Sequence, residues 1–159
     1  MNFSLSHPQL GTAKVQLVPS PLFQKCKYHL NTPSEVVSLL GNELRKQDRE
    51  HFLVIYLTNR NQVIDIEIVA IGTLEDLVIS PREVFKGAIL ASAAAIILVH
   101  NHPSGISQPS HADKQITRKL IQAGHICGIP IRDHIIIGED YFSFHENGLL
   151  STLRSMPLS

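Results

Sequence analysis

Two histidines on either side of an asparagine are the side chains in this sequence best placed to bind a metal ion. His100 and His102 follow directly on the apolar run 94–99, which is typical of a central strand covered on both faces. Because residues i and i+2 of an extended chain point to the same face, the two imidazoles converge on one point. Asp113 lies further along, in the first turn of a predicted helix, and the intervening Gly and Pro residues allow the chain to fold back. The end of the strand and the start of the helix can therefore share one metal ion.

Two imidazole nitrogens and one carboxylate oxygen leave a fourth position for water, as in catalytic rather than structural zinc sites. No cysteine lies near these residues in the sequence, so a closed thiolate site is not expected. Zinc lowers the pKa of its water toward about 7 and polarises a carbonyl oxygen. The spacing therefore predicts one Zn2+ ion per chain, with His100, His102 and Asp113 as its ligands. A general base is also required, and the ligands cannot serve as one.

Each half of this pattern also has a simpler interpretation. An isolated pair of histidines at the end of a strand is often not a metal site, and Ser110 with Asp113 is also a helix cap with an acid that complements the helix dipole. Capping and metal binding are compatible, and the whole pattern is far more specific than either half. The letters HNH at 100–102 do not indicate an HNH nuclease, whose three residues are spread over a ββα unit.

The elements that must position these residues alternate between helices and strands. Helix-start signals occur at Thr32, Ser80 and Ser110, each followed three residues later by an acidic residue. Apolar and β-branched segments predict the strands. The predicted order is a helix from 32, a hairpin of 52–58 and 62–71, a helix from 80 to about 92, a strand at 94–99, a helix from 110 to about 127, and strands at 131–137 and 141–144. This order predicts a single-domain α/β sandwich around a mixed central β-sheet.

The composition fits one folded domain with no bias toward nucleic acid. The chain has 159 residues, 43% of them apolar, and 14 basic residues balance 14 acidic ones. A neutral chain weakens any interpretation in which the whole surface binds phosphate. We expect an extended N-terminal arm at 1–31, the folded domain at 32–150 and a C-terminal tail at 151–159. Cys26 and Cys127 are expected to be reduced, packed thiols.

No apolar run approaches the roughly 20 residues that span a bilayer, and the first ten residues lack the pattern of a signal peptide. A cytoplasmic protein without membrane contact is therefore expected.

The complete pattern, His100-x-His102-x7-Ser110-x2-Asp113, resembles the JAMM motif of the MPN (JAB) metallopeptidase domain. The letters HNHPSG at 100–105, with PRE at 81–83 and DH at 133–134, are similar to the RadC-type branch of that family. The resemblance covers roughly residues 33–150. It implies a JAB/MPN-like, cytidine-deaminase-like fold and an enzyme that cleaves a peptide or isopeptide bond in a peptide or protein substrate.

The resemblance also assigns two catalytic roles. In the family, the serine of the motif helps to stabilise the oxyanion and an upstream glutamate activates the water. Carried over to this sequence, these residues are Ser110 and Glu50, the latter at the entry to the first strand of the hairpin. Without the resemblance, Glu50 is also explained as a solvated charge that closes the polar stretch 46–50.

The sequence departs from its relatives in two places. Asn101 stands where deubiquitinating members have Ser or Thr, and longer RadC proteins carry a helix-hairpin-helix segment that is not matched in the arm 1–31. The alternative functions are a DNA repair or recombination-associated protein acting on or with nucleic acid, and a catalytically silent interaction module. The zero net charge argues against the first and the complete motif against the second. Asp133 is expected to make a structural hydrogen bond or to support a metal ligand.

Overall fold

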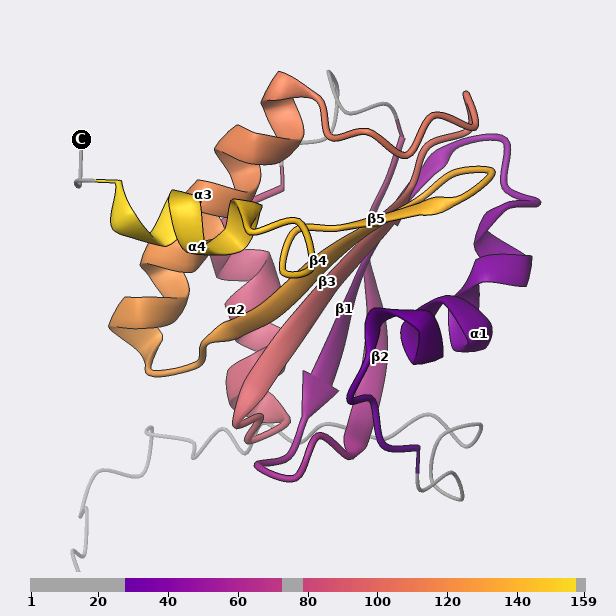
Figure 1. Ribbon diagram of the computed structural model, residues 1–159. Coiled ribbons are helices and arrows are strands. Elements are labelled where there is room, and N and C mark those ends of the chain that lie inside the picture. The colour runs from indigo at the N-terminus through magenta and orange to yellow at the C-terminus, as the bar shows by residue number, and fades with distance from the viewer. Residues whose placement is uncertain (1–27, 73–78, 157–159) are drawn as a thin grey trace, which may run out of the picture.

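The computed structural model describes residues 28–72 and 79–156, in which helices lie on both sides of one central sheet (Figure 1). The predicted arm at 1–31 therefore falls mostly outside the described residues, as does Cys26. Along the chain, the elements are α1 Pro33–Leu44, β1 Glu50–Leu57, β2 Val63–Gly72, α2 Pro81–Leu90, β3 Ala95–Asn101, α3 His111–Cys127, β4 Ile131–Ile137, β5 Tyr141–Ser143 and α4 Leu149–Ser155.

The five strands form one mixed sheet in the order β2-β1-β3-β4-β5. β1 pairs antiparallel with both β2 and β3, β3 pairs parallel with β4, and β4 pairs antiparallel with β5. The parallel pair requires a crossover connection, which α3 provides. The predicted α/β fold with a mixed central sheet is thus confirmed, and every residue of the central strand β3 is buried.

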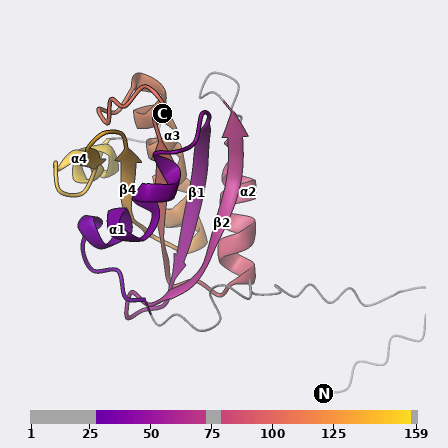
Figure 2. The ribbon, with the colours of Figure 1, turned by 90° about the vertical axis from the view of Figure 1, so that its right-hand side faces the viewer.

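The two faces of the sheet carry separate apolar clusters. The helix α1 covers one face, with Val36 and Leu44 packed over the sheet, and α2, α3 and α4 cover the other (Figures 1 and 2). The metal-site candidates come from the last residues of β3 and the first turn of α3, so they lie at one end of the sheet on the three-helix side. Among the described residues, none of the helices has both the length and the apolar character of a membrane span.

The predicted helix starts are confirmed by their caps. The Thr32 and Ser110 side chains each accept a hydrogen bond from the third helical residue in a reciprocal capping box, and Ser80 accepts one from Arg82. The helix α3 ends where Gly128 adopts a left-handed conformation with φ of 67°. The helix α2 ends at Leu90, slightly earlier than expected, and Ser92 just beyond it has φ of 52°.

Two expectations about the polypeptide were wrong. Residues 151–155 are not a tail but continue the short helix α4, whose Leu150 and Leu153 are buried in the core. This helix starts at Leu149, and Gly148 before it has no side chain to cap it, so its sequence lacks the start signal of the other three. Cys127 is free, as expected, but it is exposed rather than packed.

Candidate metal centre

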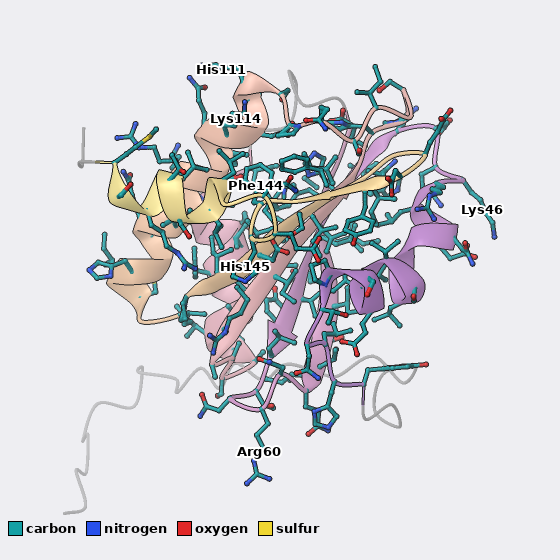
Figure 3. All side chains as sticks on the ribbon, in the orientation of Figure 1. Lys46, Arg60, His111, Lys114, Phe144 and His145 are labelled. Atoms are coloured by element: carbon teal, nitrogen blue, oxygen red, sulfur yellow. The ribbon has the colours of Figure 1, made fainter. Side chains whose placement is uncertain are left out.

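The three predicted ligands meet at the carboxyl end of β3. His100 is 1% exposed and lies in the strand, while His102 follows it and Asp113 is fully buried in the first turn of α3. His111 and Lys114 mark this end of the molecule in Figure 3, and Arg60, in the β1–β2 turn, marks the opposite end. The sharp return of the chain between strand and helix uses Gly105, which has φ of 81°.

The distances between the three side chains are close to those around a metal ion, two of them a few tenths of an ångström shorter. His100 Nε2 lies 3.0 Å from His102 Nε2 and 3.1 Å from Asp113 Oδ1, and His102 Nε2 lies 3.5 Å from Asp113 Oδ2. Bonds of about 2.0–2.2 Å in a tetrahedral site keep neighbouring ligand atoms roughly 3.3–3.5 Å apart. The three side chains therefore surround a space that a metal ion can fill.

A carbonyl oxygen fixes the tautomer of His102. The Nδ1 atom of this imidazole lies 2.6 Å from the backbone oxygen of Ile106. Because a carbonyl can only accept, Nδ1 must carry the proton, and in the neutral ring Nε2 then presents its lone pair to the other two residues. A hydrogen bond from the non-ligating nitrogen is the usual way in which a metal-binding histidine is oriented.

A chain of three buried hydrogen bonds fixes the tautomer of His100. The Thr117 hydroxyl donates to the backbone oxygen of Asp113, so Thr117 Oγ1 must accept from His134 Nδ1, 2.6 Å away. Burial lowers the pKa of His100 and lowers that of His134 well below its usual value, so both rings are neutral. His134 Nε2 then accepts from His100 Nδ1 at 2.8 Å. His100 Nε2 is left with its lone pair facing the site.

Asp113 completes the set as a charged carboxylate. Burial acts to raise the pKa of this group, and the hydrogen bonding with Ser110 is among the contacts that hold it well below the usual range. Its Oδ2 atom accepts from the Ser110 backbone N–H at 2.7 Å. The buried Oδ1 atom receives no hydrogen bond of normal geometry from the described residues. Three electron-rich atoms thus face one another, an arrangement that a cation between them stabilises.

The same carboxylate affects the charge on His102. Burial acts to lower the pKa of His102, but the Asp113 carboxylate, the Ile106 carbonyl and the more distant Glu50 outweigh it, so this pKa is raised. The electrostatic field at the His102 imidazole therefore favours positive charge, which either a proton or a metal ion can supply.

The two predicted catalytic residues lie at the edge of this centre. Glu50 is the first residue of β1 and is partly buried. The antiparallel register between β1 and β3 ends at the pair Phe52 and His100, and Glu50, two residues before Phe52, is near enough for its charge to act on His102. Ser110 caps α3, and its Oγ atom accepts from the Asp113 backbone N–H at 3.1 Å. Since a hydroxyl both accepts and donates, its O–H remains able to donate to a further acceptor.

Thr117 was not singled out from the sequence, and His134 was noted only as part of the DH pair at 133–134, with no role assigned to it. The weaker candidate beside them, Asp133, accepts from the Ser143 hydroxyl at 2.5 Å and from the backbone N–H groups of His134 and His145. The expectation that Asp133 makes structural hydrogen bonds is thus confirmed. Neighbouring residues of a strand point to opposite faces, so once Asp133 is placed on one face, His134 lies on the face of His100. This alternation is the signal that could have found His134.

A cavity of about 230 Å³ adjoins His102, between the end of α1, the loop after β3 and the β4–β5 turn. Arg45 Nε donates to the Gly138 carbonyl at 2.9 Å, and the Glu139 backbone N–H donates to the Gly105 carbonyl at 2.8 Å, so these segments are tied together around it. A larger cavity of about 310 Å³ involves Arg132 and the turn at 59–61, away from the three ligands. Of the three candidate ligands, only His102 lines the smaller cavity.

Comparison with known proteins finds a matching family model and similar chains. Residues 30–149 match the family model described as the RadC-like JAB domain. The chain is 50% identical over 122 residues to a UPF0758 protein of Desulforamulus reducens (76% of this chain, 54% of the relative) and 46% identical over 121 residues to one of Rubrobacter xylanophilus (76% and 53%). It is 42% identical over 125 residues to a UPF0758 protein of Methanosarcina mazei (78% and 55%). The chain thus spans about half the length of the curated relatives it matches.

Proposed function

This chain belongs to the family of RadC-like JAB domains, and from that membership we propose that it is a zinc-dependent hydrolase that cleaves a peptide or isopeptide bond. The observation that carries the proposal is the convergence of three lone-pair atoms, from His100, His102 and Asp113, on one buried point. The hydrogen bonds that fix both imidazole tautomers support it, because they direct the metal-binding nitrogen of each ring to that point.

The donor set favours zinc. Two imidazoles and one carboxylate, with no thiolate, are the ligand types of catalytic zinc sites that keep a position for water or substrate. When bound, zinc would supply Lewis acidity, both acidifying a water molecule and polarising the carbonyl oxygen of the bond to be cleaved. All other parts of the proposed reaction fall to side chains of the chain itself.

We assign the proton transfers to Glu50. The three ligand side chains are committed to the metal, and Glu50 is the carboxylate whose charge acts on His102. In the proposed reaction, Glu50 accepts a proton from the attacking water and returns it to the leaving amine. General acid–base catalysis of this kind contributes typically about 10²–10⁴-fold in rate.

Ser110 is proposed to stabilise the oxyanion. Its Oγ atom is held by the Asp113 backbone N–H, and Asp113 is itself a ligand in this scheme, so the hydroxyl is fixed close to the metal. A donor that is already oriented before the reaction stabilises developing negative charge without reorganisation.

The substrate is proposed to be a peptide or a protein, entering through the cavity beside His102. The alternative, a protein that acts on nucleic acid, is disfavoured by the balance of 14 basic and 14 acidic residues. A direct comparison of substrates distinguishes the two.

The test is activity profiling of the full chain, purified without chelator, against a quenched-fluorescence peptide library, isopeptide-linked peptides, and single- and double-stranded DNA. Each assay is run before and after treatment with a chelator and after zinc is restored, with Glu50→Gln as the matched control. We expect peptide or isopeptide cleavage that chelation abolishes and zinc restores, and no cleavage of DNA. Peptide cleavage that survives complete metal removal would contradict the proposal, and metal-dependent DNA cleavage would favour the alternative.

A further inference from the structure

Asn101, the residue between the two histidines, is connected to both neighbours of Glu50. It is the last residue of β3 and only 1% exposed. Its side-chain Oδ1 accepts from the His51 backbone N–H at 2.8 Å, and its Nδ2 donates to the Arg49 carbonyl at 3.0 Å. One carboxamide therefore holds the polypeptide on both sides of Glu50.

These two hydrogen bonds extend the sheet beyond its backbone pairing. The pairing of β1 with β3 runs from Leu57 and Ala95 to Phe52 and His100. The Asn101 carboxamide, which has the donor and acceptor of a peptide group, then makes the next contact with the chain before Phe52. The backbone of Asn101 is itself fixed on the other side, because it pairs with Ile137 of β4.

We propose that Asn101 is a positioning residue that sets where the Glu50 carboxylate lies relative to the metal centre. This inference rests on the proposed function, in which Glu50 transfers the proton. Asparagine suits the task because its side chain offers one donor and one acceptor at the required length. A leucine of similar size offers neither, and a serine is too short to reach both backbone groups.

The metal ligands do not depend on this side chain. The backbone segment that carries His100 and His102 is held by β4, through the pairing of His100 with Ile136 and the hydrogen bond from the His102 N–H to the Ile137 carbonyl at 2.9 Å. Loss of the Asn101 carboxamide therefore releases Glu50 while leaving the ligands in place. Misplacing a catalytic group by about 1 Å can cost roughly 10²-fold in rate.

The experiment replaces zinc with cobalt, whose visible absorption bands respond to its ligands and to ionisation at the metal, so that no substrate is needed. The variants are Asn101→Leu, Asn101→Ser, Glu50→Gln and the double variant Glu50→Gln/Asn101→Ser. Ser143→Ala is the control, because Ser143 is buried and hydrogen-bonded in β5 but contacts Asp133 and the 146 backbone rather than the centre. Cobalt stoichiometry and the pH of the spectral transition are measured for each protein.

We expect every variant to bind one cobalt ion per chain. The Asn101 variants shift the spectral transition in the same direction as Glu50→Gln, the double variant behaves like Glu50→Gln alone, and Ser143→Ala matches the wild type. If Asn101→Leu fails to fold, the spectral transition of Asn101→Ser is compared with that of Glu50→Gln in its place. The inference would be overturned if both Asn101 variants left the spectral transition unchanged, or if the shift in the double variant were larger than that of Glu50→Gln alone. Loss of cobalt from the Asn101 variants alone would also overturn it. A wild-type chain that binds no cobalt would instead overturn the proposed function.

Discussion

The buried hydrogen bond between His134 and His100 provides a sharp test of how the metal centre is organised. His134 is fully buried, accepts from His100 Nδ1 and donates to Thr117. His134→Leu replaces the ring with an apolar side chain. It removes the acceptor that fixes the tautomer of His100, and it leaves the His100 N–H in a position that water cannot reach.

The expected losses of stability and of metal affinity follow from these contacts. A buried donor left without a partner costs about 1–3 kcal/mol, so the metal-free protein should lose roughly that much stability. Removal of the hydrogen-bond partner of a metal-binding histidine typically lowers metal affinity about 10–100-fold. This loss corresponds to about 1.4–2.8 kcal/mol in binding free energy. His134→Gln retains an acceptor oxygen for His100 and should recover part of the affinity.

Zinc affinity is measured by competition with a chromophoric chelator, and the stability of the metal-free protein by denaturant unfolding. Ser143→Ala is the matched control, since it removes a buried hydrogen bond to Asp133 elsewhere in the sheet. It should lower stability and leave zinc affinity unchanged. If His134→Leu binds zinc as tightly as the wild type, the hydrogen bond does not organise the ligand and the reasoning is refuted.

Three further predictions concern the other residues of the centre. Glu50→Gln should retain zinc and a near-normal melting temperature while turnover falls about 10²–10⁴-fold, and undiminished turnover would remove Glu50 from the mechanism. Ser110→Ala should lose about 1 kcal/mol of stability with the cap and roughly 10²-fold in turnover with the oxyanion donor; a loss of stability alone would make Ser110 only a cap. Burial acts to lower the pKa of His102, but the Asp113 carboxylate chiefly raises it above its ordinary value of 6.5. A proton therefore competes with the metal for His102 Nε2. Zinc affinity should therefore be full above that raised pKa and fall as the pH drops through it, and calorimetric titrations showing constant affinity from about pH 8 to 5 would contradict this assignment.

The grouping of the three candidate ligands could be predicted from the sequence because its geometry is local. The spacing of His100 and His102 in an extended segment, and of Asp113 from the cap of its helix, follow from the periods of strand and helix. The starts of α1, α2 and α3 were predictable for the same reason, because each has a capping side chain next to its first turn.

The contacts that support the ligands could not be predicted in this way. The pairing of His134 with His100 joins residues 34 positions apart, and that of Asn101 with His51 joins residues 50 apart. Both depend on which strands are neighbours and in which register, and the sequence pattern does not contain this information. The helix α4 was missed because its stability comes from burial of Leu150 and Leu153 rather than from a local signal.

Elemental analysis of the full chain, purified without chelator, decides whether the chain holds a zinc ion at His100, His102 and Asp113. We expect about one zinc ion per chain in the wild type. We expect loss of that zinc in Asp113→Asn, whose side chain keeps the size of a carboxylate but not its charge, and retention in Glu50→Gln. A wild-type protein that holds no transition metal and takes up none on reconstitution, or an Asp113→Asn protein that keeps its zinc, would contradict these expectations.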